Sequence, residues 1–422
     1  MPAPLQGGGF SLNLPNVHFP VLGAMAWVGL IFLLHIIIAA WSMGVVILAP
    51  TYELIGKVTG DERLDRYARS LTKVNIRLFS LGAVLGSFAV FSLTGLYPNL
   101  FIRLVILFFL PVLYAFLSWF VTIAAELVYY YRWDAWAAAH KWRHIAVGYV
   151  AGIVEQSFLF FIVGLDSYMM TPGRGIGPGI FFNASYWPEL LHRFVGNLSY
   201  ASFLIALVMV VLGARRWESK DAPYYRWAAG LSMVVGFVML LPQAVIGFVF
   251  ADSIRQASPA AFAYSFTGPM DWMWIVQLGF LGIVLLGTNV YFGQTRTTRS
   301  ALGPLLTGAV VVCSVVALLP EQLYPRPLFW VRYIFLGLSL LLTLAHCLIW
   351  RPWLRGVRRP DLNRLGRWSV GMVGITAVLL FMLMGVIRET TKGAGDGYAV
   401  YGEETQSQGQ NMFKAPDGGF FP

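Results

Sequence analysis

The chain has 422 residues, of which 58% are hydrophobic, 15% are aromatic and only 12% are charged. Soluble globular proteins carry about 25% charged residues, so this composition excludes an ordinary soluble protein and predicts a polytopic α-helical membrane protein. The formal net charge is +10. Because Lys and Arg are enriched in the cytoplasmic loops of membrane proteins, we read this charge as a membrane feature and expect no nucleic-acid partner.

The predicted fold class is all-α, a polytopic transmembrane helical bundle of about ten spanning helices in a lipid bilayer. A helix needs about 20 apolar residues to cross the hydrocarbon layer. Apolar runs of that order lie near residues 21–50, 78–100, 103–131, 146–170, 190–213, 226–251, 272–293, 302–320, 328–350 and 368–387. Residues 1–20 form an N-terminal segment before them. A polar, Gly-rich tail, residues 388–422, follows, and we expect it to lie along a partner.

Basic residues gather in every second loop, and this alternation predicts the topology. They are Lys57 to Arg77, Lys141 and Arg143, Arg215 to Lys220, Arg296 and Arg299, and Arg351 to Arg364. The intervening loops hold a single Arg174, Arg255 or Arg326. By the positive-inside rule, both termini face outward. The expected location is the cytoplasmic membrane of a bacterium or archaeon.

Two histidines and one methionine are candidate ligands of a haem iron. His192 stands near the outer start of the fifth run, and His35 lies near the middle of the first. A histidine within a spanning helix costs free energy unless something uses it, and neutral imidazole is a standard axial ligand of haem. The seventh run offers Met273 at the same outer level as His192. The alternatives are a histidine solvated at the headgroup level for His192, and a buried hydrogen-bond partner for His35.

Three carboxylates are candidates for a proton pathway. Glu126 and Glu155 lie within apolar runs, and Glu53 lies toward the inner end of the first helix. Buried acids of this kind either pair with a cation or stay neutral by a raised pKa. We expect Asp166 to cap the outer end of the fourth helix. The inner histidines, His144 and His346, are an alternative pair that would clamp a second haem.

Residues 21–300 resemble subunit I of the cytochrome bd quinol oxidases. The strongest segment is HIAVGYVAGIVEQSFLFFIVGLDSYMMTPG, from His144 to Gly173, which opens with a histidine and ends in a polar residue, an aromatic, Met and Pro as in the family. His35 is followed by Glu53 eighteen residues later, also as in the family, where that histidine ligates a haem of the active-site pair. His192 matches the family's ligand of the low-spin b haem, and Glu126 matches an inner carboxylate on helix three.

The sequence departs from the family at several positions. Ser118 and Ile334 stand where the family has acidic residues of the active-site haem pair. The quinol-binding loop after the sixth helix is reduced to residues 251–271. The motif Gly-Arg-Gln-Pro-Trp is matched only in a distorted form, by Tyr324–Trp330. These departures predict little quinol-driven oxygen uptake and no haem d band.

The methionine that lies opposite the helix-five histidine in the family aligns with Ile275 here. Met273 stands two residues earlier, and we expect it to take that place. The resemblance thus divides the chain into a family-like core, residues 21–300, and additional transmembrane helices, residues 301–387.

The resemblance implies a haem-binding membrane subunit of a respiratory electron-transfer complex. It would hold one or more b haems, with a second near His35, and pass electrons between a quinol or a cytochrome c-like partner and a terminal acceptor. Other membrane subunits are expected partners, and the outer docking region would lie near Phe181–Tyr186 and the tail.

Two alternatives stay open. One is a haem-free, quinone-interacting anchor of an oxidoreductase. The other is a secondary transporter that uses the membrane acids as an ion site. A transporter predicts inverted repeats and paired broken helices, whereas Pro242 is a single break without a mate.

Overall fold

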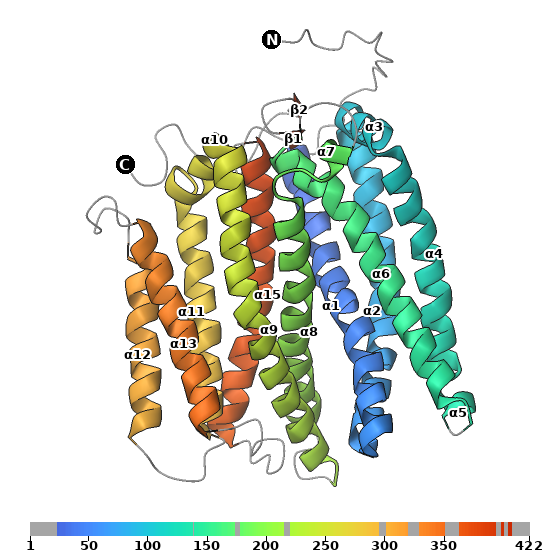
Figure 1. Ribbon diagram of the computed structural model, residues 1–422, viewed down its shortest axis with the longest axis vertical. Coiled ribbons are helices and arrows are strands. Elements are labelled where there is room, and N and C mark those ends of the chain that lie inside the picture. Colours follow the sequence, from blue (N-terminus) through green and yellow to red (C-terminus); the bar gives the residue numbers. More distant parts are fainter. Residues whose placement is uncertain are drawn as a thin grey trace.

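The chain folds as a bundle of long helices that run side by side (Figure 1). The computed structural model describes residues 23–137, 139–173, 178–214, 220–294, 301–319, 329–350, 363–393, 398–400 and 404–406. Within these residues, nine helices are long and apolar enough to cross a membrane. The prediction of an all-α polytopic transmembrane bundle is confirmed.

The long helices follow the predicted runs. They are α1 (Gly23–Thr59), α2 (Glu62–Leu96), α4 (Phe109–Tyr131), α6 (Lys141–Met170), α8 (Tyr186–Ala214), α9 (Ala222–Ala257), α11 (Asp271–Gln294), α13 (Phe329–Trp350) and α15 (Arg364–Gly393). The remaining predicted run, 302–320, forms α12 (Leu302–Ala317), an apolar helix of 16 residues. At about 1.5 Å per residue it covers roughly 24 Å, which is shorter than the ~30 Å hydrocarbon layer.

Short elements close the two ends of the bundle. At one end lie α3 (Pro98–Leu107), α7 (Pro178–Phe181), α10 (Pro259–Phe262) and the hairpin of β1 (Tyr398–Val400) and β2 (Glu404–Gln406), with α5 (Trp133–Trp136) at the other (Figure 1). A π-helical turn, η1 (Ala263–Thr267), follows α10. The two strands pair antiparallel with Tyr398 opposite Gln406, and β1 contacts α6 and α15. The described part of the tail therefore packs on the chain's own helices.

The first basic loop is much shorter than expected, because α2 begins at Glu62 and not near residue 78. Gly60 has a φ of 72°, a left-handed conformation that glycine adopts without strain and that allows the tight turn from α1 into α2. Asp61 then caps α2 by accepting a hydrogen bond of 3.0 Å from the Arg63 backbone. The first turns of α2 are amphipathic, with Tyr67 and Leu71 buried. A hydropathy window misses such a helix because its exposed face is basic.

The predicted run at 103–131 is two helices, since α3 ends at Leu107 and α4 begins at Phe109. At the other end of the chain, α15 continues to Gly393, so Arg388 belongs to a helix and not to the polar tail. The helices α1 and α9 contain Pro50 and Pro242 and continue through them. The break expected at Pro242 is therefore absent from α9.

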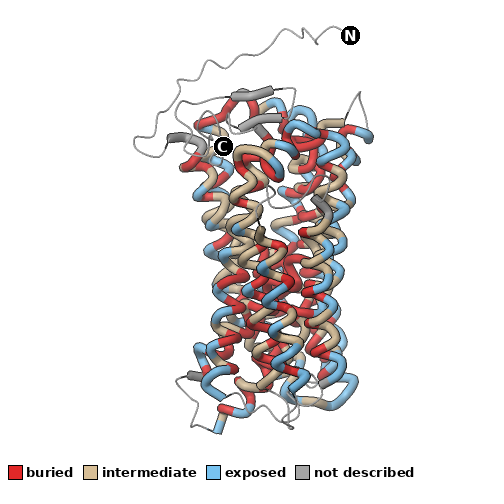
Figure 2. Tube along the Cα trace, turned by 90° about the vertical axis from the view of Figure 1, so that its left-hand side faces the viewer, coloured by how far each residue is buried: buried red, intermediate tan, exposed pale blue. Residues whose placement is uncertain are grey.

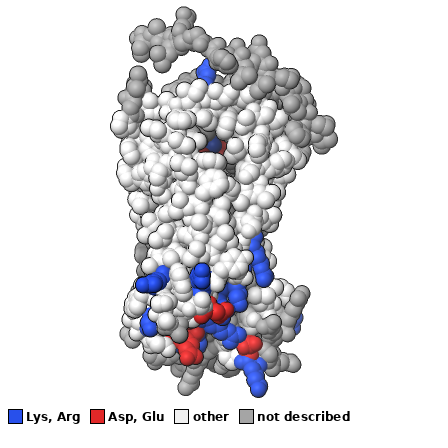
Figure 3. Space-filling view, turned by 90° about the vertical axis from the view of Figure 1, so that its right-hand side faces the viewer, with Lys and Arg blue, Asp and Glu red and all other residues white. Residues whose placement is uncertain are grey.

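Charge and burial divide the bundle in the way that a membrane protein requires. Figure 2 shows buried residues along the middle of the bundle and exposed residues on its outside. Figure 3 shows Lys, Arg, Asp and Glu gathered at the end near α5, below a broad band that is white except for a small recessed patch of charged atoms. We call this charged end the inner end and the opposite one the outer end. The first helix, α1, begins at the outer end, and the last helix, α15, ends there (Figure 1).

Several segments to which the sequence-based predictions refer lie outside the residues that the structure describes. These are residues 1–20, Arg174 to Gly177, Arg215 to Ser219, Arg296 and Arg299, Tyr324 to Leu328, Arg351 to Arg359, and the tail beyond Gln406.

Candidate functional site

His192 lies near the outer start of α8, with its ring against α9. A Cβ added to Gly247 of α9 would lie only 2.9 Å from Cε1 and 3.1 Å from Nδ1 of His192. The Gln243 backbone lies beside the same ring. Nδ1 is buried and makes no hydrogen bond. The Phe250 ring lies 6.0 Å from the imidazole.

His35 lies on α1 with its ring against α2. Its Nδ1 is 2.9 Å from the backbone oxygen of Gly82, and an added Cβ on Gly86 would lie 2.7 Å from its Cε1. A carbonyl oxygen can only accept, so Nδ1 carries the proton and Nε2 keeps its lone pair. The expected alternative for His35, a buried hydrogen-bond partner, is therefore present, but it occupies only one of the two ring nitrogens.

Met273 lies at the outer start of α11 and is 1% exposed. It belongs to a buried cluster that also contains Met170 and Met270, and Phe250 packs against this cluster. Phe250 thus connects the surroundings of Met273 with the ring of His192. Ile275 is only half-buried on the same helix.

A buried charge cluster, which the sequence interpretation missed, joins α6, α8 and α15 at the outer end. Asp166 lies 3.0 Å from Arg193 and 2.8 Å from Arg388, and Glu189 lies 3.1 Å from Arg193 and 3.4 Å from Arg388. Asp166 therefore pairs with two guanidinium groups and does not cap α6. The spacing of Glu189 and Arg193, four residues apart on a helix, was the one local sign of this cluster. Lys392 and Glu389 extend it at 2.8 Å.

Two of the three candidate proton-pathway acids lie close together in the middle of the bundle. Asn75 of α2 donates to Glu126 of α4 at 2.9 Å and to Ser42 of α1 at 3.4 Å. Glu155 of α6 interacts electrostatically with Glu126 and hydrogen bonds to Ser42. Both carboxyl groups are buried.

The third acid, Glu53, lies in a separate cluster at the inner end. It accepts a hydrogen bond of 2.7 Å from Tyr129, lies 2.7 Å from Lys141, and lies 2.7 Å from Nδ1 of His144. The cluster opens to the inner surface through Asp65, which pairs with Lys141 and is about one third exposed.

His144 has no nitrogen left for a metal, because its Nε2 donates to the Tyr129 backbone oxygen at 2.7 Å. His346 lies on α13, on the opposite side of the bundle from α6 (Figure 1), and its Nδ1 is 2.9 Å from the Asn289 side chain. The alternative in which His144 and His346 clamp one haem is therefore wrong.

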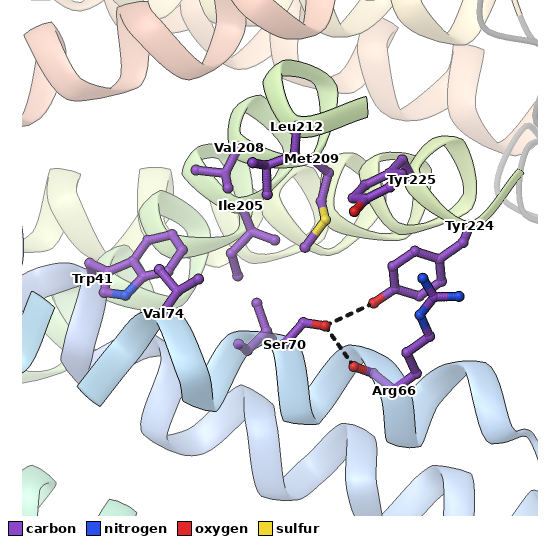
Figure 4. A pocket seen from close by; sticks show the side chains of 11 residues that line it. Trp41, Arg66, Ser70, Val74, Ile205, Val208, Met209, Leu212, Tyr224 and Tyr225 are labelled. Atoms are coloured by element: carbon purple, nitrogen blue, oxygen red, sulfur yellow. Dashed lines mark hydrogen bonds between the residues drawn. The ribbon is translucent and has the colours of Figure 1, made fainter. Parts of the chain in front are cut away.

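A cavity of about 90 Å³ lies near the inner end between α2, α8 and α9 (Figure 4). Its walls are mainly apolar, and Ser70, Tyr224 and Arg66 form the polar side. Trp41, Leu71, Val74, Ile205, Val208, Met209, Leu212 and Tyr225 complete the lining. The volume equals that of about three water molecules in the liquid, and neither His35 nor His192 reaches it.

The segment expected to dock a partner, Phe181–Tyr186, is largely built into the protein. Asn183 and Ser185 bond to Thr171 within the buried network at the end of α6, and Tyr186 is fully buried. Phe182 is 43% exposed and stacks at 5.8 Å on Trp187, which is 52% exposed. Phe182 and the adjacent Trp187 therefore lie at the surface of the protein.

His35 is compatible with the role of an axial ligand to a haem. In the part of the chain that the structure describes, no three His, Cys, Asp or Glu side chains come together in a metal-binding group. A porphyrin supplies its own nitrogen ligands and needs only axial donors. His35, with one nitrogen hydrogen bonded to a backbone carbonyl and the other free to ligate, has the arrangement typical of a metal-bound histidine.

Comparison with known proteins agrees with this fold. Residues 25–387 match the family model of cytochrome bd terminal oxidase subunit I, and no curated protein matches the sequence. Among solved structures, the chain resembles the bd oxidase from Geobacillus thermodenitrificans with a TM-score of 0.54 and 16% identity. The match covers 88% of this chain and 96% of that chain, and at this identity it shows the fold alone. The family match includes the additional helices beyond residue 300, and from its extent the chain belongs to the cytochrome bd terminal oxidase subunit I family.

Proposed function

We propose that this chain binds b-type haem through His192 and His35 and passes electrons within a respiratory membrane complex. As a member of its family, it is a multi-pass membrane protein of respiratory electron transfer, typical of prokaryotic cytoplasmic membranes. The observation that carries the proposal is the His35 ring, whose Nδ1 is held by the Gly82 carbonyl at 2.9 Å while Nε2 remains available. Met273 is the proposed second ligand beside His192.

Bound haem would supply one-electron redox chemistry, and the chain supplies the ligands and a dry setting. At the outer end, Phe250 lies beside His192, and Phe262 and Phe266 stack at 4.7 Å within the Met273 cluster. These side chains would provide apolar packing beside the proposed ligands. A low local dielectric and a fixed ligand set are what tune the potential of a haem.

Electrons would enter or leave on the outer side, because both His192 and Met273 lie at the outer ends of their helices. The donor is either a quinol or a cytochrome c-like protein, and the exposed pair of Phe182 and Trp187 offers an apolar contact on that side. Family members typically pair with a second membrane subunit and with quinol.

A proton pathway would run from the inner surface to the middle of the bundle. The path starts at Glu53, continues through the Tyr129 hydroxyl to Thr72, and reaches Asn75 one turn further along α2. Asn75 contacts Glu126, and Glu155 completes the acid pair. Two acids buried side by side cannot both be ionised cheaply, so one of them holds a proton that it can release.

A haem assay tests the proposal on the purified full-length chain. We expect a b-type pyridine haemochrome and a reduced-minus-oxidised difference spectrum. His192→Ala should remove the low-spin component, and His35→Ala should lower the haem content, while both variants stay in the membrane. Wild-type protein without b-type absorbance would favour a haem-free, quinone-interacting anchor. Unchanged spectra in both variants would assign the histidines to packing.

We further propose that the isolated chain has little quinol-driven oxygen uptake. Ser118 donates its hydroxyl to the Ala115 backbone at 2.9 Å, and Ile334 is 64% exposed on the outside of α13. Neither position presents an acid to the interior. An oxygen electrode with a short-chain quinol tests this, and rapid, cyanide-insensitive uptake or a haem d band would contradict it.

A further inference from the structure

We propose that Gly86 and Gly247 are positioning residues for the two haem-ligating histidines. Each glycine lets an imidazole lie directly on the backbone of the neighbouring helix, so that the ring has one permitted orientation. The inference rests on the proposed function, since it assumes that His35 and His192 are ligands.

The contact distances carry the inference. A Cβ at Gly86 would lie 2.7 Å from Cε1 and 3.1 Å from Nδ1 of His35, and a Cβ at Gly247 would lie 2.9 Å and 3.1 Å from the same atoms of His192. Separations below 3.0 Å are essentially never seen for a real Cβ. Any side chain larger than hydrogen would therefore push either ring by several tenths of an ångström.

The two sites repeat one arrangement on different helix pairs. On α2, the carbonyl that meets His35 belongs to Gly82, four residues before Gly86. On α9, the backbone beside His192 belongs to Gln243, four residues before Gly247. Residues four apart lie on the same face of a helix. In both cases the glycine, which has no side chain, leaves room for the ring beside that backbone group.

This arrangement selects which nitrogen is free to ligate. At His35, Nδ1 donates to the Gly82 carbonyl, whose second lone pair can keep the helical hydrogen bond, so Nε2 is the nitrogen left to ligate. At His192, the ring packs on the α9 backbone with no hydrogen bond at Nδ1. In both rings Nδ1 lies nearer than Nε2 to the Cβ that would be added to the glycine. The distances are 3.1 Å and 3.4 Å for His35, and 3.1 Å and 4.0 Å for His192. The atom nearest the added Cβ is Cε1 in both rings, and Nδ1 is the nearer of the two nitrogens.

Alanine substitutions test the proposal, because each has a matched control. Gly236 also lies on α9 and packs against a ring of α8, since its Cβ would lie 2.8 Å from the Phe203 ring. Gly385 of α15 packs against α1, with its Cβ 2.7 Å from Leu33. Gly236→Ala creates a comparable clash with a ring of α8, and Gly385→Ala creates a milder one with the flexible end of Leu33; neither clash involves a histidine.

The readouts are haem content per protein, the difference spectrum, the midpoint potential and thermal stability. Loss of a group that orients a metal ligand typically weakens metal binding by about 10- to 100-fold. We expect weakening of this order, with shifted spectra and potentials, for Gly86→Ala and Gly247→Ala. The two control variants should lose thermal stability with an unchanged spectrum and potential per bound haem.

Different outcomes separate the two levels of the proposal. If His35→Ala and His192→Ala keep their haem, the proposed function fails. If they lose it while Gly86→Ala and Gly247→Ala match their controls, only the positioning role is overturned.

A double-mutant cycle covers the case in which Gly247→Ala does not accumulate. Adding His192→Ala removes the ring that the new methyl group meets, so the double variant should recover its level in the membrane. A double variant that remains as poorly folded as Gly247→Ala would overturn the inference.

Discussion

The outer and inner parts of this bundle both bury histidines, but they use them differently. At the inner end, both ring nitrogens of His144 are engaged, one by Glu53 and one by a backbone carbonyl. In the outer part, His35 uses one nitrogen, and the Nδ1 of His192 makes no hydrogen bond. The partners of the ring nitrogens, and not burial in a spanning helix, therefore separate a structural histidine from a candidate ligand.

The largest expected effect tests the structural role of the inner cluster. Glu53→Gln removes a fully buried charge that faces Lys141 and His144. Breaking such a buried pair costs about 3–5 kcal/mol, because the remaining charge stays desolvated. Thermal unfolding in detergent measures it. Asp65→Asn, at the exposed edge of the same cluster, should cost less than about 1 kcal/mol. Equal losses in the two variants would show that the cluster is not held by Glu53.

The second prediction compares the two histidine types directly. His144→Ala should destabilise the protein by about 1–3 kcal/mol, since Glu53 and the Tyr129 carbonyl each lose a hydrogen-bond partner. Its haem content and spectrum should equal those of the wild type. His192→Ala should show the reverse. It should lose haem, and its unfolding temperature should differ little from that of the wild type when both are measured without haem. Haem loss in His144→Ala would show that engagement of both ring nitrogens does not mark a structural histidine.

A third, smaller effect concerns the outer site. Met273→Leu conserves volume in a buried cluster, so its stability cost should stay below about 1.5 kcal/mol. If the thioether is a ligand, the midpoint potential should fall, because methionine ligation raises the potential relative to all-nitrogen ligation. A redox titration measures the shift, and Met270→Leu, in the same cluster, is the control. An identical potential in both variants would leave Met273 as packing.

The smallest effect contrasts an exposed ion pair with the buried one around Glu53. The hydrogen bonds that Arg63 donates hold the pKa of Asp61 below its ordinary value of 3.8. This stabilisation is present above pH 3.8 and is lost as the pH falls through the lower, folded-state pKa. Asp61→Ala should cost about 1 kcal/mol at neutral pH, mainly as a lost helix cap. The difference in unfolding free energy between the two proteins should shrink as the pH falls from 7 through the folded-state pKa of Asp61, and a difference that does not shrink would contradict the assignment.

Much of the fold could be predicted because hydropathy is a local property. A segment either contains enough apolar residues to cross the bilayer or it does not, and the alternation of basic loops then orders the segments. The same reasoning failed where a helix extends beyond the bilayer. The basic start of α2 and the end of α15 around Arg388 both read as loop or tail, because their stability comes from packing against other helices.

Residue types alone determined that His35, His192 and the buried acids were candidates, since each is costly within an apolar helix. Met273 was a candidate because of its level in the membrane and the family resemblance. Only the tertiary structure decided which of them meet. It placed Glu126 beside Glu155 and Glu53 elsewhere, and it engaged both nitrogens of His144. The physical reason is that hydrogen bonds and ion pairs act over about 3 Å between helices that are far apart in the chain. Hydropathy is summed along one segment and carries no information about the side chain it will face.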